Sequence, residues 1–167
     1  MIEFDRCALD GLDATEALGR ELAAILRPGD SVLLEGPLGA GKTALARALL
    51  RSACGDPALE VPSPSYTLVQ SYQVRGFTLS HFDLWRLDGP QGLVELGWDE
   101  ARDGVVLVEW PDRLGALTPA DALLLRLEPV AGMPERRIAT LGGWEHRRRP
   151  DLGAATRGAT AGGATAA

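Results

Sequence analysis

The chain is poor in the residues that form disulfides and zinc sites. It has two histidines and two cysteines, and Cys7 and Cys54 stand far apart without C-x-x-C spacing. This pattern excludes a disulfide framework and a structural zinc site, so we expect both thiols to be reduced. No apolar run approaches the roughly 18 to 20 residues that cross a membrane, and the first five residues are acidic rather than basic. The composition therefore predicts a cytoplasmic protein without a membrane segment.

Positive charge is also in short supply. The 167 residues carry 23 acids against 17 bases, so the net charge of -6 should repel nucleic acid, and any role there is expected to run through a partner. The chain is long enough for one well-buried domain, which we place at residues 1–143. Residues 144–167 hold an arginine triplet and then a Gly/Ala/Thr run, which predicts a disordered tail. We interpret the triplet as solvated charge and not as an RNA site.

Lysine is the scarcest cation, because Lys42 stands alone against sixteen arginines. It lies in Gly36-Pro37-Leu38-Gly39-Ala40-Gly41-Lys42-Thr43, which fits the phosphate-binding pattern G-x-x-x-x-G-K-[ST]. A compact ammonium on a flexible stem can reach between two phosphates, whereas a guanidinium is a broad planar fork. Residues 31–35 predict a buried strand entering the loop, and residues 43–50 predict a helix leaving it. The residues expected to bind a nucleoside triphosphate are Leu38, Gly39, Ala40, Gly41, Lys42, Thr43 and Ala44.

Hydrophobic periodicity in the rest of the chain predicts an α/β fold. Asp13 opens a capping-box pattern, and apolar residues recur at helical intervals up to residue 26. Further strands are expected at residues 66–73, 77–84, 104–109, 122–127 and 137–141. The first two suit an antiparallel hairpin, and the third has the apolar composition of a central parallel strand. We therefore predict a P-loop NTPase-like fold, with a mixed, mostly parallel sheet flanked by helices.

Two acids stand at the ends of predicted strands, where nucleotide hydrolysis needs a carboxylate. Thr43 would place its hydroxyl on Mg²⁺, and Glu109 matches the loose strand-end motif whose acid meets the same ion. Asp83 also ends a strand, and alternation puts His81 on the same face. A salt bridge with Arg86 is the alternative for Asp83. For His81 we favour a satisfied buried histidine.

An extended segment follows the loop helix, because the prolines at positions 62 and 64 disfavour helix in the residues before them. It carries the hydroxyls of Ser63, Ser65 and Thr67. Phosphate-sensing switch loops commonly contribute a hydroxyl to metal or γ-phosphate from such a position. A hydroxyl-rich turn is an equal alternative.

Four ordered blocks of the sequence resemble the TsaE family, also called YjeE. They are Gly36 to Thr43, Ser63-Pro64-Ser65-Tyr66-Thr67-Leu68-Val69, His81-Phe82-Asp83-Leu84-Trp85-Arg86-Leu87 and Leu107-Val108-Glu109-Trp110-Pro111. TsaE proteins are the ATPase component of bacterial tRNA threonylcarbamoyladenosine synthesis. The resemblance implies a slow ATPase that supports repeated turnover by the TsaD and TsaB proteins, which transfer the threonylcarbamoyl group to the adenosine beside the anticodon. Contact with tRNA would then be indirect.

The resemblance also implies roles for individual residues. ATP phosphates would lie on the loop with Lys42, and Mg²⁺ would lie near Thr43 and Glu109. Asp83 would be a functional carboxylate next to the nucleotide, and we include it among the candidates for catalysis and for the metal. Trp110, in the family's E-W-P block, would sit beside the site.

Two positions depart from the family's pattern. Ser65 stands where threonine is usual, and serine keeps the hydroxyl that would contact metal or phosphate. Trp85 stands where tyrosine is usual, which keeps the aromatic bulk and loses the hydroxyl.

Three other functions compete with this interpretation. A P-loop small-molecule kinase would share the loop and the sheet, but no paired-arginine lid segment is evident between residues 115 and 129. A GTPase would need the guanine-reading N-K-x-D motif, and the single lysine is already used at position 42. The third is a nucleotide-gated binding module, in which ATP orders residues 61–72 and hydrolysis is incidental.

Overall fold

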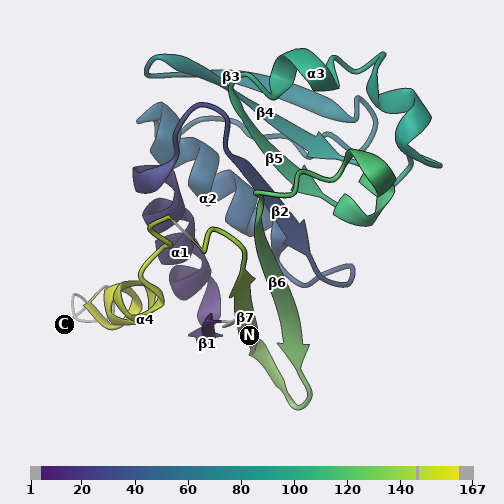
Figure 1. Ribbon diagram of the computed structural model, residues 1–167. Helices are drawn as coiled ribbons and strands as arrows, with labels where there is room; N and C mark the ends of the chain where they lie inside the picture. Colours follow the sequence, from purple (N-terminus) through teal and green to yellow (C-terminus); the bar gives the residue numbers. More distant parts are fainter. Residues whose placement is uncertain (1–4, 146, 162–167) are drawn as a thin grey trace.

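The computed structural model describes residues 5–145 and 147–161. Within these residues it contains one seven-stranded sheet with helices packed on both faces (Figure 1). The elements in chain order are β1 (Asp5–Asp10), α1 (Gly11–Ile25), β2 (Ser31–Glu35), α2 (Lys42–Cys54), β3 (Val69–Val74), β4 (Phe77–Asp83), η1 (Pro90–Leu93), α3 (Trp98–Ala101), β5 (Val105–Glu109), η2 (Pro111–Leu117), β6 (Leu123–Val130), β7 (Met133–Gly142) and α4 (Leu152–Ala161).

Parallel pairing is concentrated in the centre of the sheet, whose strand order is β1-β7-β6-β2-β5-β4-β3. Strand β2 pairs parallel with β5 and β6, and β4 pairs parallel with β5. Strand β3 and the pair of β7 and β1 add antiparallel strands at the two edges. The predicted α/β fold with a mixed sheet is confirmed, but the sheet is not mostly parallel, since three of the six strand pairings in the described residues are antiparallel. Because β2, β4 and β5 run in the same direction, their carboxyl ends meet at one edge, where the loop after β2 begins.

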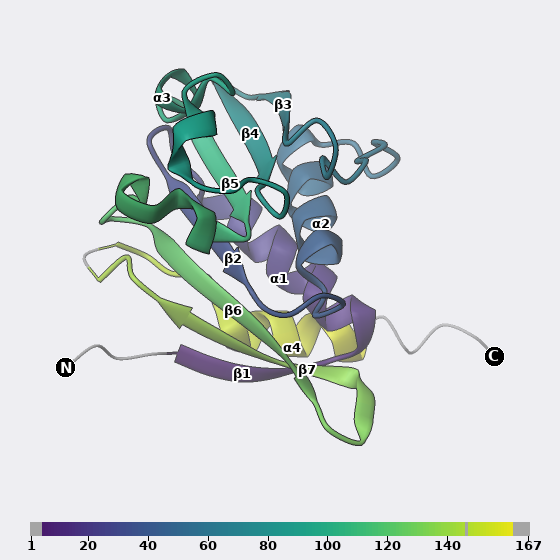
Figure 2. The same cartoon turned by 90° about the vertical axis from the view of Figure 1, so that its right-hand side faces the viewer.

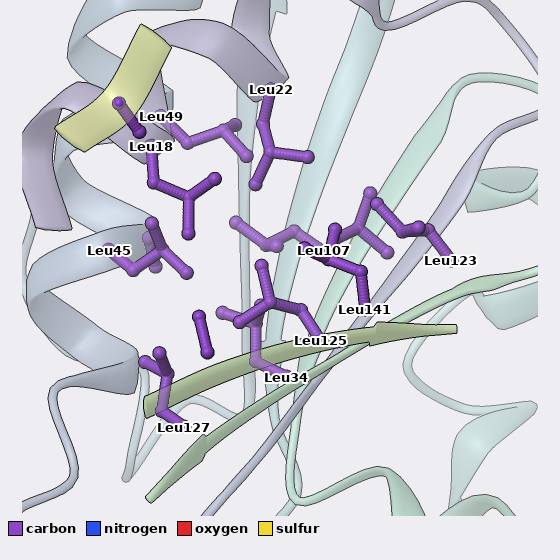
Figure 3. Close-up of a cluster of buried hydrophobic side chains, with 14 of the residues drawn as sticks. Leu18, Leu22, Leu34, Leu45, Leu49, Leu107, Leu123, Leu125, Leu127 and Leu141 are labelled. Carbon is purple, nitrogen blue, oxygen red and sulfur yellow. The ribbon is translucent and has the colours of Figure 1, made fainter. Parts of the chain in front are cut away.

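The main core lies between the sheet and the helices α1 and α2. Figure 3 shows its leucines pointing toward one another from both helices and from the strands. At the crossing of the two helices, a Cβ on Gly19 would lie 2.8 Å from the Cβ of Ala48, so this close approach requires glycine. On the opposite face of the sheet, Trp98 of α3 packs edge to face on Phe82 of β4, with ring centroids 5.2 Å apart. None of the helices in the described residues is long and apolar enough to span a bilayer.

The N-terminal elements differ from the prediction. Helix α1 begins at Gly11, so Asp13 lies inside it and does not cap it. Asp10 precedes the helix without a side-chain capping bond, and its carboxylate instead accepts a hydrogen bond from Arg136 at 2.6 Å. Strand β1 was not predicted at all, because its short sequence lacks clear alternation and its pairing partner, β7, lies more than a hundred residues away. Such pairing depends on the tertiary structure.

The predicted disordered tail is corrected for the residues that the structure describes. Helix α4 follows the sheet and packs against α1 and β1, as Figure 2 shows, and Ala155 is fully buried. Arg147, from the arginine triplet, pairs with Asp30 and lies 4.1 Å above the ring of Trp144. Arg147 therefore contributes to packing. Helix α4 forms because α1 and β1 offer a surface that a low-complexity helix can cover. Residues 162–167 of the predicted tail lie outside the described residues.

Candidate functional site

The loop between β2 and α2 curls around a cavity of about 280 Å³ at the carboxyl edge of the sheet. Gly39 and Gly41 have φ values of +80° and +102°, which glycine adopts without strain. The cavity is lined by all the residues that were predicted to bind nucleotide or metal or to act in catalysis, together with Ser63 and Trp85. Thr67, the third hydroxyl of the extended segment, is not part of this lining. Its lining is Leu38, Gly39, Ala40, Gly41, Lys42, Thr43, Ala44, Ser63, Ser65, Asp83, Trp85, Glu109 and Trp110.

The ammonium of Lys42 is held close to the loop at the start of α2. Its Nζ donates hydrogen bonds to the carbonyls of Gly36 at 2.5 Å and Pro37 at 3.0 Å, and only 5% of the residue is exposed. Burial lowers the pKa of Lys42, while the charges of Glu109 and Asp83 oppose that shift. A charged, largely desolvated ammonium beside the helix N-terminus is an arrangement that can bind phosphate.

Glu109 ends β5 and joins two elements of the site through its two oxygens. Oε1 accepts a hydrogen bond from the Thr43 hydroxyl at 3.0 Å, and Oε2 lies 2.7 Å from Nε2 of His81. A threonine hydroxyl next to a carboxylate is the hard-oxygen donor set that Mg²⁺ prefers. Among the described residues, no three histidine, cysteine or acidic side chains gather to hold a metal by themselves.

His81 has a hydrogen-bond partner that the sequence did not predict. It is a fully buried and hydrogen-bonded histidine, as expected, but its partner is the site carboxylate Glu109. Nδ1 of His81 has no hydrogen-bond partner among the described residues. Because a carboxylate can only accept, Nε2 must carry the proton that the pair shares. Strand alternation places His81 and Asp83 on one face, and this signal could have indicated that His81 points toward the site. The contact with Glu109 itself depends on β4 and β5 being neighbours.

Asp83 ends β4 directly opposite Glu109 in the parallel pair. Its Oδ2 accepts hydrogen bonds from the hydroxyls of Ser65 at 3.3 Å and Ser63 at 3.5 Å, and its Oδ1 accepts one from the backbone amide of Trp85 at 3.1 Å. The alternative partner Arg86 lies instead over the ring of Tyr66, 4.2 Å from its centroid. Through these hydrogen bonds Asp83 joins the segment that carries Ser63 and Ser65 to the carboxyl edge of the sheet.

Two tryptophans form one wall of the cavity. Trp110 follows Glu109 in a left-handed conformation, with φ at +59°, and its ring lies 4.1 Å from Nζ of Lys42. Trp85 packs against Trp110 with ring centroids 4.3 Å apart and the ring planes tilted by 51°, and it remains 47% exposed. The departure from tyrosine at position 85 therefore places a larger aromatic ring where it extends the wall beside the lysine.

The surroundings of Gly36 explain why the first position of the phosphate-binding pattern is a glycine. Gly36 has φ at +148°, and a Cβ there would collide with the carbonyl oxygen of Leu127. We expect Gly36→Ala to lower the free energy of unfolding by about 2 to 3 kcal/mol, because backbone strain adds to overpacking. Gly29→Ala is the matched control, since Gly29 also has positive φ but open space around it. Chemical denaturation measures both variants, and equal losses would contradict the role of the collision.

Comparisons with known proteins agree with this geometry. The profile of the family described as "Threonylcarbamoyl adenosine biosynthesis protein TsaE" matches residues 9–138. The tRNA threonylcarbamoyladenosine biosynthesis protein TsaE of Rickettsia felis is 38% identical over 72% of this chain and 70% of its own length. The protein of the same name from Synechocystis is 39% identical over 65% of this chain and 71% of its own. A crystal structure of Bacillus subtilis YdiB has the same fold, with a TM-score of 0.71, 24% identity and 98% of each chain covered.

Proposed function

The chain belongs to the TsaE family, and on this premise we propose that it is a Mg²⁺-dependent ATPase that supports tRNA threonylcarbamoyladenosine synthesis together with the TsaD and TsaB proteins. The observation that supports the proposal most is the convergence of the phosphate loop, Thr43, Asp83 and Glu109 on one cavity. These side chains come from α2, β4 and β5. A phosphate site, a metal-binding pair and a second carboxylate are the parts that phosphoryl transfer to water requires.

In the proposed mechanism, the loop amides and Lys42 bind the β- and γ-phosphates of ATP. The Thr43 hydroxyl and Glu109 would hold Mg²⁺, which when bound would neutralise charge on the phosphate oxygens. His81 keeps the Glu109 carboxylate turned toward Thr43 by occupying its second oxygen. Asp83, on the neighbouring strand β4, adds negative charge and holds the Ser65 hydroxyl at the cavity, where it could serve the metal or the attacking water.

The role of His81 in orienting the Glu109 carboxylate can be tested without removing Glu109. We expect His81→Phe to lower kcat for ATP hydrolysis by about tenfold, since Glu109 would lose a charge-assisted hydrogen bond worth roughly 1.5 to 3 kcal/mol. His81→Gln, which can present a side-chain N–H to Oε2, should retain more activity than His81→Phe. Steady-state phosphate release measures both. Identical activity in the two variants would mean that the hydrogen bond to Glu109 does not matter.

The proposed docking to TsaD and TsaB depends on residues 63–66, a segment that hydrogen-bonds to Asp83. Ser63 and Ser65 hydrogen-bond to one another at 2.8 Å and to Asp83. Tyr66 beside them is 82% exposed. A γ-phosphate and Mg²⁺ that drew on these hydroxyls or on Asp83 would change the conformation of the segment. We therefore propose that the nucleotide controls docking to TsaD and TsaB, and that tRNA is reached only through that complex.

Pull-down with TsaD and TsaB tests the proposed function directly. Retention should differ between ATP, ADP and nucleotide-free conditions, and equal retention under all three would contradict nucleotide-controlled docking. A parallel reaction with γ-labelled ATP should release the label as inorganic phosphate. Transfer of the label to a metabolite from a panel would favour the kinase alternative.

A further inference from the structure

Arg137 of β7 reaches the outer side of the phosphate loop from almost a hundred residues away in the sequence. Its Nε donates to the carbonyl of Ala40 at 3.0 Å, and its Nη2 donates to the carbonyl of Gly39 at 3.3 Å. Its Nη1 donates to the carbonyls of Pro134 at 2.7 Å and Arg136 at 3.0 Å. The guanidinium is thus fastened to its own strand on one side and to the loop on the other.

Other arginines near this edge of the sheet have different partners. Arg136, the neighbour on β7, pairs with Asp10, and Arg126 of β6 pairs with Glu35. Within the described residues, the guanidinium hydrogen bonds to main-chain carbonyls of the loop come from Arg137. A planar fork of donors suits two adjacent carbonyls, which a single ammonium cannot engage with the same geometry.

The hydrogen bond to the Ala40 carbonyl also fixes the direction of the next amide, the N–H of Gly41. In a trans peptide the C=O of one residue and the N–H of the next point in opposite directions. The hydrogen bond from Arg137 to Ala40 therefore turns the N–H of Gly41 away from β7. Gly41 lines the cavity. Since Gly41 is a glycine at φ +102°, the backbone by itself restrains rotation of this peptide plane only weakly.

We propose that Arg137 is a positioning residue that preorganises the phosphate loop by keeping the Gly41 amide aimed into the cavity. The inference rests on the proposed function, because the amide matters only if the cavity takes phosphate. Arg137 approaches the loop's outer carbonyls and so acts on the ligand through the backbone. It stabilises the loop conformation in which the Gly41 amide already points toward a bound phosphate. This lowers the free-energy cost of ordering the loop on binding.

Replacement of Arg137 should weaken nucleotide binding more than it slows turnover. For Arg137→Gln in the full-length protein we expect the Kd for Mg-ATP by calorimetry and the KM for hydrolysis to rise about tenfold, because binding is lost equally in ground and transition states. The kcat at saturating ATP should stay within about twofold of the unmodified protein. Arg137→Lys keeps the charge and loses the planar fork of donors, so its Kd and KM should lie between those of Arg137→Gln and those of the unmodified protein. Hydrogen exchange of the amides of residues 40 to 42 should be faster in Arg137→Gln.

A matched variant separates this effect from a general loss of charge. Arg75→Gln removes the same charge from the exposed turn between β3 and β4, and it should leave Kd and KM unchanged. A lower melting temperature for Arg137→Gln with unchanged Kd would overturn the proposal, as would an equal rise in Kd for Arg75→Gln. If Arg137→Gln fails to fold, the Kd of Arg137→Lys decides, and a value equal to that of the unmodified protein overturns the proposal. Failure of the unmodified protein to bind Mg-ATP would instead refute the proposed function.

Discussion

Replacing Lys42 by alanine is expected to abolish measurable ATP binding, a loss of more than about 100-fold in affinity. The ammonium lies at the start of α2, is almost fully buried and stands between the loop carbonyls and the ring of Trp110. Alanine would remove the single lysine charge of the chain from the cavity. Calorimetric titration with Mg-ATP measures the effect, and thermal unfolding of the free variant checks that the fold survives.

Lys42→Arg serves as the matched control for charge. Arginine keeps the positive charge but brings a planar guanidinium, which does not fit a site shaped for a compact ammonium. We therefore expect Lys42→Arg to bind ATP far more weakly than the unmodified protein does. Affinity close to that of the unmodified protein for either variant would mean that the phosphates do not contact this residue.

Removal of either strand-end acid should separate binding from hydrolysis. We expect Glu109→Ala and Asp83→Ala to lower kcat by about 100-fold or more, since each would lose electrostatic stabilisation that operates in the transition state. The Kd for ATP should change by no more than about fivefold, roughly 1 kcal/mol, because the loop and Lys42 remain. Stopped-flow nucleotide binding and steady-state phosphate release measure the two quantities in the same samples.

Asp99→Ala provides the control for these acid variants. Asp99 is an exposed acid of α3, outside the cavity lining, and its removal should change neither rate nor affinity. Normal turnover in both Glu109→Ala and Asp83→Ala would show that other carboxylates support the reaction. Loss of ATP binding in both would place the acids in the binding step instead of the chemical step.

Much of the site was predictable because its parts are encoded locally. Residues 31–43 specify a strand, a loop and a helix start along one short stretch of chain, and the structure has all three. The parallel arrangement of β4 and β5 brings Asp83 and Glu109 to the same edge, as their positions at the ends of predicted strands suggested. The residues predicted for phosphate binding, metal binding and catalysis all line one cavity. Their chemical roles remain predictions.

Other features depended on which strands become neighbours. Neither the contact of His81 with Glu109 nor the reach of Arg137 to the loop follows from a local pattern, because each joins residues far apart in the sequence. Strand β1 needed β7 as its partner, and α4 needed the surface of α1 and β1 before its weakly hydrophobic sequence could pack as a helix.

The sequence by itself determined that this chain has a glycine loop with the phosphate-binding pattern, an α/β fold and acids at the ends of strands. Each of these is written in residues that are neighbours along the chain, through glycine conformations and hydrophobic periodicity. Only the tertiary structure decided how Glu109 is oriented, what holds the Ala40 carbonyl and which parts of the C-terminal segment are ordered. Those outcomes depend on strand order and on packing between distant segments, where a side chain's partner is set by the fold as a whole.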